Sequence, residues 1–476
     1  MQDLLLVGLP GPTHFFGGLS EGNLASQKSA LQESRPREAA LQVLNLMYEL
    51  YKKGVPVAVC PPHPRPYFKS QKEKDYFEHI VNKERCAGND DFGMSNTKCE
   101  ISDLKRKKGA FLGDKSKKEG LEIDFLLSRY SSSFMWTANM ATVTPSRDST
   151  DKNVHITPSN LKTFLHRSIE TSFSTKILRM VFKSDCFCIH DPVEKPDEGA
   201  ANHARLDNGI HLFSYNFTQD SSNKLVLRQS LSASKQVAKN HLLDFSNCMF
   251  FQQNVLSVQS GVFHNDVLFL SHKNVIFCHE QTFEKMGKVF DDVCRQWGQV
   301  GEEKLVFIRV DSKELTVEEA VHSYLFNSQL ISNEMKNGMP STMTLIASST
   351  VKLCPRSRAV VDRVLKENES ITHVIYVDLT ESMKNGGGPA CLRLRIPVTN
   401  EELELVHPGV IFDETLYYNL KDWINSYYRE KLNESDFFDK VLAVESTRAL
   451  SDLSKLLDMD DLYRGYEYFT EMNGVN

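Results

Sequence analysis

The chain has 476 residues, of which 41% are hydrophobic, and a formal net charge of −6 at pH 7. This length can supply a large core, enough for two or three domains at the usual ~150 residues per domain. The mildly acidic balance gives no support for nucleic-acid binding. No apolar run approaches the ~18 residues that a membrane-spanning helix needs, so we expect a soluble protein with no membrane contact.

The ten cysteines are scattered and form no dense framework, so we expect reduced thiols and a cytoplasmic protein. A first strand is predicted from Leu4 to Leu9 and is too short for a signal sequence. It leads into a glycine-rich loop that reaches Ser26 and lacks the Gly-Lys-Ser/Thr ending of a P-loop. A helix from Pro36 to Lys53 and a strand from Val55 to Cys60 follow.

A polar stretch, residues 69–120, comes next and carries the basic run Lys105-Arg-Lys-Lys108. It has few strong helix or strand signals. We interpret it as an exposed, partly disordered insertion in a single domain that spans residues 1–476. An alternative is that the basic run docks on anionic surfaces.

Beyond residue 121, strands alternate with helices and no linker is evident, which indicates an α/β fold. The predicted strands are 209–215, 267–270, 274–278, 305–310, 343–348, 373–379 and 392–396. The predicted helices are 161–170, 230–243, 280–297, 317–330, 356–368 and 414–432.

The segment Cys186-Phe-Cys188-Ile-His190 offers ligand types that bind metals. No second pair of ligands lies nearby in the sequence, and the alternation of a strand explains the pattern equally well. Both interpretations stay open.

Three sequence groups near predicted strand ends offer catalytic side chains. They contain Glu198 (in DEGAANH), His264 (in FHND) and Cys391 (in NGGGPAC). A thiolate can attack, a histidine can shuttle protons and a carboxylate can orient a cation. On the residues alone, Glu198 could equally cap a helix, His264 could be a satisfied core histidine and Cys391 could be an inert buried thiol.

Six longer stretches of the chain are distinctive: GGLSEGNLAS (17–26), MWTANMATVTPSRDSTDKNVHITPSNL (135–161), DEGAANH (197–203), GVFHNDV (261–267), SYLFNSQL (323–330) and ESMKNGGGPACLRLR (381–395). These stretches closely resemble the succinylarginine dihydrolase family of the pentein, or guanidine-modifying, superfamily. The resemblance keeps the family order from the N-terminus to beyond Asp436, with only about 68–120 outside it.

The resemblance implies a five-bladed α/β propeller of pseudo-fivefold ββαβ units around a central polar site. It implies Cys391 as the nucleophile, His264 as the general acid/base, and Glu198 as the third catalytic residue, gripping the guanidinium. The substrate contacts that it implies are Gly17, Gly18, Leu19, Ser20, Glu21, Gly22, Asn23, Leu24, Ala25, Ser26, Asn139, His166, Arg167, Arg228, Asp266 and Asn385.

By the same resemblance, the chain hydrolyses N2-succinylarginine to N2-succinylornithine, two ammonia and carbon dioxide through a thiouronium on cysteine. No metal or organic cofactor is required, and we expect a homodimer. Glu21 and Leu24 depart from the family pattern in the substrate loop, and the surroundings of Arg228 are only loosely similar. A guanidine hydrolase or deiminase for another arginine derivative, or a catalytically inactive pentein that acts as a binding module, therefore remain alternatives.

Overall fold

The computed structural model describes residues 1–20, 23–87, 114–216, 227–300, 304–333 and 342–466. Its strands are β1 (Gln2–Gly8), β2 (Val57–Cys60), β3 (Ala141–Thr144), β4 (Val154–Pro158), β5 (Phe187–Ile189), β6 (His203–Leu206), β7 (Ile210–Tyr215), β8 (Cys248–Gln252), β9 (Phe269–His272), β10 (Val275–His279), β11 (Val306–Val310), β12 (Gln329–Ser332), β13 (Met343–Ser348), β14 (Ile371–Val377) and β15 (Arg393–Val398).

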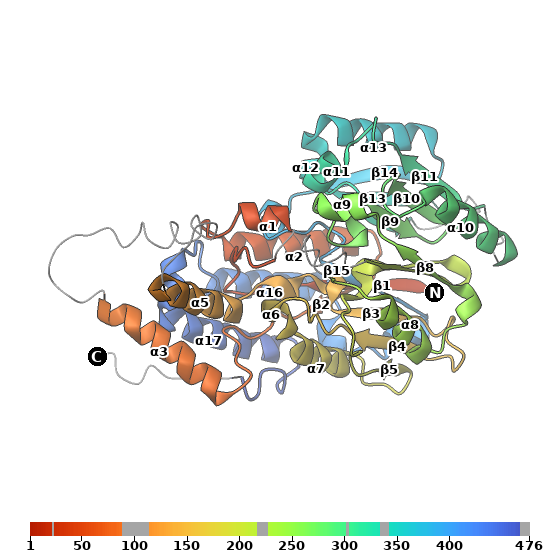
Figure 1. Ribbon diagram of the computed structural model, residues 1–476. Coiled ribbons are helices and arrows are strands. Elements are labelled where there is room, and N and C mark those ends of the chain that lie inside the picture. Colours follow the sequence, from red (N-terminus) through yellow and green to blue (C-terminus); the bar gives the residue numbers. More distant parts are fainter. Residues whose placement is uncertain (21–22, 88–113, 217–226, 301–303, 334–341, 467–476) are drawn as a thin grey trace.

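The helices cover the outside of these strands (Figure 1). They are α1 (Leu24–Lys28), α2 (Pro36–Lys52), α3 (Gln71–Ala87), α5 (Asp114–Arg129), α6 (Leu165–Ser168), α7 (Thr171–Val181), α8 (Leu231–Asn240), α9 (Val255–Gln259), α10 (Met286–Val300), α11 (Val317–Ser323), α12 (Ser349–Leu353), α13 (Pro355–Glu367), α14 (Thr380–Met383), α15 (Asn400–Glu404), α16 (Glu414–Tyr427) and α17 (Lys440–Leu456). None of the described helices combines the length and the apolar character needed to cross a membrane.

Within the described residues the strands form five three-stranded sheets, ordered β15-β1-β2, β3-β4-β5, β6-β7-β8, β9-β10-β11 and β12-β13-β14. In every sheet the middle strand pairs antiparallel with one neighbour and parallel with the other. A helix connects each parallel pair, as such a crossover requires. The structure thus confirms the predicted α/β fold of five ββαβ units.

The sheet β15-β1-β2 joins strands that lie far apart in the sequence. Strand β15, which follows β14 along the chain, pairs antiparallel with β1, so that Leu5 lies opposite Arg395. A large apolar core then joins this sheet to the helices α2, α16 and α17, with Leu44, Trp423 and Leu453 among its buried side chains. Figure 1 shows these helices side by side.

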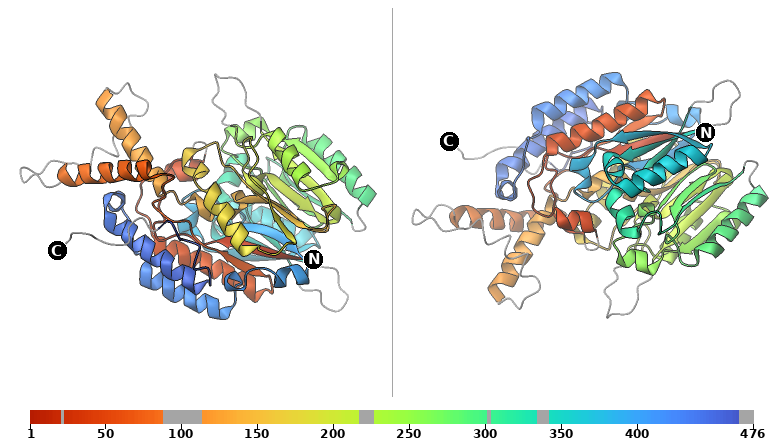
Figure 2. Two further views of the ribbon diagram at one scale, coloured as in Figure 1. Left: turned by 90° about the horizontal axis from the view of Figure 1, so that it is seen from below. Right: turned by 90° about the horizontal axis from the view of Figure 1, so that it is seen from above.

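Helices α3 and α5 occupy part of the stretch in which few regular elements were expected. They contact one another and project from the side of the molecule (Figure 2). Phe77 and Leu127 anchor them in an apolar cluster with Phe15 and Phe437. The sequence of both helices is largely polar, so the spacing of apolar residues does not predict them. The basic run 105–108 lies outside the described residues.

Two predicted helices are wrong because tertiary contacts override the local pattern. Residues 161–170 begin as a turn, since Leu161 has a left-handed φ of 48° and the Asn160 amide donates to the carbonyls of Val193 and Lys195. Helix α11 ends early, at a left-handed Tyr324 with φ 57°, and the remainder of 317–330 becomes a loop and β12. The helix predicted from residue 280 begins only at Met286.

Candidate active site

The predicted nucleophile lies directly before β15, at the end of the glycine-rich loop. Cys391 is 3% exposed. Its backbone N–H donates to the Gly388 carbonyl over 3.1 Å and to Oδ1 of Asn327 over 3.3 Å. The same Oδ1 accepts a hydrogen bond from the Gly388 N–H at 2.9 Å. Asn327 thereby fixes the loop that presents the thiol.

Each of the three glycines in this loop has a close neighbour that leaves no space for a Cβ atom. Gly386 has a φ of 88°, and a Cβ there would meet the Asn23 side chain at 2.2 Å. A Cβ on Gly387 would lie 2.9 Å from the Trp136 ring, and one on Gly388 would lie 2.8 Å from Oδ1 of Asn327. Larger residues would push the loop off its supports.

Glu198 is the electrostatic centre of the site. Its Oε2 accepts hydrogen bonds from Nη1 of Arg167 at 2.6 Å and from Nε2 of His264, and Nη1 of Arg228 lies 3.7 Å away. Its Oε1 is buried and accepts no hydrogen bond from the described residues. Three basic side chains therefore converge on one carboxylate oxygen, which leaves the other oxygen for a further donor.

The backbone around Glu198 is held from three directions. Its N–H donates to Oε1 of Gln229 at 2.8 Å, and its carbonyl accepts from Nδ2 of Asn139 at 3.0 Å. Gly199 follows with a φ of 72°, where a Cβ would lie 2.6 Å from the Ser159 hydroxyl. This explains why the sequence has a glycine directly after the glutamate.

Asp266 is the acidic residue nearest the thiol. Cys391 Sγ donates to Oδ2 of Asp266 at 3.5 Å, and Nδ2 of Asn327 donates to the Asp266 carbonyl at 3.3 Å. Oδ1 of Asp266 is buried with no hydrogen-bond partner among the described residues. The aspartate also lines a second cavity, together with Arg393.

Most of the predicted site residues line one cavity. These are Gly17, Gly18, Leu19, Ser20, Asn23, Ser26, Asn139, His166, Arg167, Arg228, His264, Asn385 and Cys391. Within it, the Ser20 hydroxyl and Nε2 of His166 lie 3.2 Å apart. Glu198 is fully buried next to the lining, and Asp266 belongs to the neighbouring cavity.

Two predicted loop residues, Leu24 and Ala25, do not line this cavity in the structure. The side chain of Leu24 is 46% exposed on α1, and Ala25 packs against the large apolar core. Glu21 and Gly22 lie outside the described residues.

Burial and neighbouring charges shift the pKa values of the predicted catalytic groups and of Asp266. Burial, with the negative charge of Asp266, raises the pKa of the Cys391 thiol well above its usual value. Burial also raises the pKa of Asp266 to about 7. Burial lowers the pKa of His264 to about 4 against the opposing effect of Glu198. The pKa of Glu198 is lowered despite its burial, because Arg167, His264 and Arg228 stabilise the anion.

The structure adds residues that were not predicted for the site. Asn327 holds the thiol loop, and the cavity is also lined by Phe15, Ser131, Ser132, Ser133, Trp136, Phe263 and Gly386. Asn327 and Trp136 lie within the stretches that carried the family resemblance, and that is the only signal for them. Nothing in their local sequence indicates that they approach Cys391.

The sequence is similar to known proteins along most of its length. The sequence profile of the family described as succinylarginine dihydrolase matches residues 3–87 and 112–466. The N-succinylarginine dihydrolase of Pseudoalteromonas translucida (strain TAC 125) is 36% identical over 474 residues, which cover 96% of this chain and 97% of that protein. The enzyme of the same name from Legionella pneumophila (strain Paris) is 35% identical and covers 97% and 98%, respectively.

The N-terminal domain of ArgZ, an arginine dihydrolase from cyanobacteria, aligns with 84% of this chain and 98% of its own, at 14% identity and a TM-score of 0.48. The family profile extends further than the sequence motifs did, because it includes residues 69–87 and 112–120 and omits only 88–111 between its two matched parts. The family profile and the two relatives each match nearly the whole chain. The chain therefore belongs to the succinylarginine dihydrolase family.

Proposed function

We propose that this chain hydrolyses the guanidinium group of N2-succinylarginine, giving N2-succinylornithine, two ammonia and carbon dioxide. One observation carries this proposal. Cys391 and His264 line one cavity, and each is hydrogen-bonded to a buried carboxylate, that of Asp266 and that of Glu198, respectively. Each carboxylate keeps one buried oxygen that no described group donates to. A guanidinium is a planar cation with several N–H donors, which matches these acceptors.

In the proposed complex the substrate itself activates the thiol. A guanidinium between Glu198 and Asp266 brings a positive charge next to Cys391, and an adjacent positive charge favours the thiolate. It also favours the ionised form of Asp266, whose pKa of about 7 lies within reach of neutral pH. The thiol is therefore reactive mainly when a cationic substrate is bound.

The first step is attack of Sγ on the guanidinium carbon. The carbon–sulfur bond forms, and the bond from that carbon to one terminal nitrogen breaks. The proton that leaves the thiol passes through His264 to the departing nitrogen, which leaves as ammonia. The positive charge stays on a thiouronium bound to Cys391. Glu198 stabilises the imidazolium that His264 forms in transit, since the two side chains are hydrogen-bonded.

Water then adds to the thiouronium carbon and the carbon–sulfur bond breaks. This step yields a ureido compound, the free thiol and one proton, for which neutral His264 is the acceptor. A second attack by the same thiol on the ureido carbon releases the second ammonia. Hydrolysis of the resulting S-carbamoyl group gives a carbamic acid, which breaks down to the amine and carbon dioxide.

The succinyl end of the substrate carries two carboxylates. Arg167 and Arg228 both line the cavity, and both lie beside the carboxylate of Glu198. Phe164 and Phe263 hold the Arg228 guanidinium between their rings, at 4.7 and 5.1 Å from the ring centroids. These arginines are the groups that we assign to the carboxylates, together with backbone N–H groups of 17–26.

The deciding experiment counts ammonia released per N-succinylarginine consumed by the purified chain. We expect two ammonia and one succinylornithine. One ammonia with a ureido product would instead indicate a deiminase, and no ammonia with retained ligand binding would indicate an inactive binding module. Arginine and citrulline serve as competing substrates. A preference for either over N-succinylarginine would show that the chain acts on another arginine derivative.

We further propose a single catalytic domain in a cytoplasmic homodimer. The family match, which leaves out only residues 88–111 between its two parts, supports the single domain. The described cysteines are all free thiols, which supports a reducing compartment. The homodimer rests on the family resemblance, and sedimentation equilibrium of the full chain tests it.

A further inference from the structure

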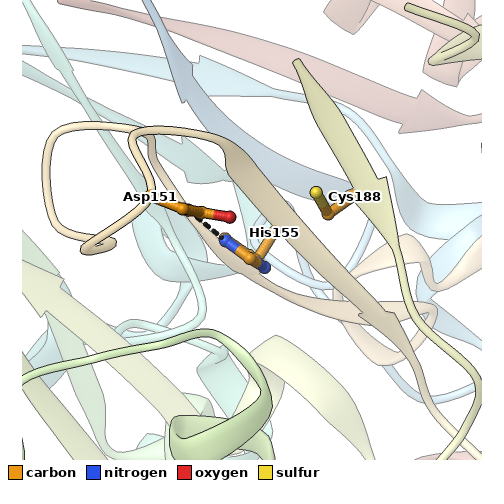
Figure 3. Close-up of side chains that lie close together, drawn as sticks. All are labelled: Asp151, His155 and Cys188. Carbon is orange, nitrogen blue, oxygen red and sulfur yellow. Dashed lines mark hydrogen bonds and ion pairs between the residues drawn. The ribbon is translucent and has the colours of Figure 1, made fainter. Parts of the chain in front are cut away.

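Three side chains of metal-binding type meet at one end of the second sheet. Asp151, His155 and Cys188 each offer one ligand atom, and these atoms all lie within 4.8 Å of one another. Figure 3 shows the Asp151 carboxylate hydrogen-bonded to the His155 imidazole, with the Cys188 sulfur beside this pair on the neighbouring strand. We refer to these three residues as the Asp–His–Cys cluster.

The sheet itself brings these residues together. His155 on β4 and Cys188 on β5 are direct partners in the parallel ladder, so their side chains leave the same face of the sheet. Asp151 lies in the turn that enters β4, and its Oδ1 is 2.8 Å from Nε2 of His155. The β-ladder therefore fixes the spacing of two ligands before any ion binds.

The imidazole is oriented in the way that metal-binding histidines usually are. Nδ1 of His155 lies 2.8 Å from Nε2 of His190, and this contact leaves the other ring nitrogen directed at Asp151. Such a second partner fixes the tautomer and the ring orientation of a metal ligand. His155 is buried, whereas the Asp151 side chain is 34% exposed, which gives an ion access from solvent.

We propose that the Asp–His–Cys cluster binds one Zn²⁺, with a water molecule as the fourth ligand. A set of one carboxylate, one imidazole and one thiolate suits Zn²⁺, whereas Mg²⁺ and Ca²⁺ prefer oxygen ligands throughout. The proposal is independent of the reaction assigned to Cys391, and no step of that reaction passes through the ion.

The position of the cluster assigns the ion a structural role. In the β3–β4 hairpin, Ala141 pairs with Pro158 at the end near Asn139 of the active site, whereas Thr144 pairs with His155 at the opposite end. The ion would join the turn before β4 to β5, which is the edge strand of its sheet. Bound Zn²⁺ then stabilises the folded chain, because it binds the native state in preference to the unfolded one.

The structure also separates the two cysteines of the Cys186-Phe-Cys188 motif. Cys188 belongs to the cluster, whereas Sγ of Cys186 donates to the Ser184 hydroxyl at 3.6 Å and is not part of it. The two thiols lie two residues apart and are both partly buried. Cys186 is therefore the matched control for Cys188.

The test uses the full chain carrying Cys391→Ser, which keeps the active-site thiol out of the measurement. Co²⁺ replaces Zn²⁺ as a spectroscopic probe, because a thiolate ligand gives a charge-transfer band in the near ultraviolet. We expect this band, one tightly bound Zn²⁺ per chain and a melting temperature that rises with Zn²⁺ concentration. Adding Cys186→Ser should preserve all three results, and adding Cys188→Ser should abolish the band and weaken Zn²⁺ binding at least about tenfold.

Asp151→Asn changes a partly exposed side chain, so it serves as a second variant if Cys188→Ser impairs folding. We expect it to weaken Zn²⁺ binding about tenfold as well while leaving the folded structure intact. The proposal is overturned if the parent chain gives no cobalt–thiolate band, or if the Cys186 and Cys188 variants bind Zn²⁺ equally.

Discussion

The Cys391 thiol donates to Oδ2 of Asp266 across 3.5 Å, and the pKa values of both side chains are raised. Burial is the main cause for each, and the carboxylate adds to the effect on the thiol. A thiol in this setting is a poor nucleophile, because only the thiolate attacks efficiently. Because of this contact, a positive charge that approaches Asp266 should also favour the thiolate form of Cys391.

Asp266→Asn tests this coupling. Removing the negative charge next to the thiol should lower the pKa of Cys391, so that iodoacetamide alkylates the free enzyme at lower pH than in the wild type. Turnover should nevertheless fall at least about 100-fold, since the variant loses a carboxylate that we propose holds the guanidinium. Alkylation rates followed across pH, with peptide mapping of Cys391, give the result. An unchanged or higher thiol pKa would contradict the assigned contact.

Asp266 should also make the stability of the fold depend on pH. Its pKa is raised from 3.8 to about 7 in the folded chain, so the native state binds more protons than the unfolded state between these values. The stability that this group contributes is complete below the unfolded pKa and is lost as pH rises toward 7. In urea unfolding, Asp266→Asn should therefore gain stability relative to the wild type between about pH 5 and about pH 8.

The control for this measurement is Asp191→Asn, because the Asp191 side chain is 91% exposed. Its stability difference from the wild type should stay constant over the same pH range. A constant difference for the Asp266 variant as well would mean that its folded pKa is not raised.

Asn327→Ala should disturb the thiol loop without removing a reacting group. The substitution leaves the N–H of Gly388 without its acceptor and removes one of two acceptors from the N–H of Cys391. We expect about 1–3 kcal/mol lower stability, and kcat lowered more than KM is changed, because the nucleophile is misplaced. Asn425→Ala, at an exposed position of α16, is the control, and an unaltered kcat in the Asn327 variant would refute its positioning role.

Gly386→Ala should weaken the wall of the cavity. The residue has a φ of 88° and its new Cβ would collide with the Asn23 side chain, whose Nδ2 donates to the Gly386 carbonyl. We expect a loss of about 1–3 kcal/mol in the free energy of unfolding and a raised KM. Gly298→Ala, in α10, meets nothing within 4 Å and should be neutral or stabilising. Equal behaviour of the two variants would argue against the close contact.

Much of the fold could be predicted from periodicity, because single elements carry their own signal. The buried stripe of α2 and the apolar run of β1 are local patterns, and the structure places both within two residues of expectation. Residues 161–170 and 317–330 differ because their conformation depends on partners far away in sequence. The Asn160 amide reaches carbonyls more than 30 residues away, and Asn327 reaches the loop at Gly388.

The candidate site could likewise be predicted only in part from the sequence. Cys391, His264 and Glu198 are proposed as catalytic residues from their motifs, through the family resemblance. Their geometry could not, because the convergence of Arg167, Arg228 and His264 on one oxygen of Glu198 depends on how the units are arranged around the ring. The free oxygens of Glu198 and Asp266 are likewise visible only once the packing is known.

The central claim is that Cys391 attacks the guanidinium carbon of the substrate, and rapid acid quench of the enzyme with N-succinylarginine tests it most directly. The account predicts a mass increase on the peptide that contains Cys391, and complete loss of both adduct and ammonia release in Cys391→Ser. Cys60→Ala, at an equally buried cysteine with 3% exposure, should retain turnover. Ammonia release by the Cys391→Ser variant, or an adduct on another cysteine, would contradict the account.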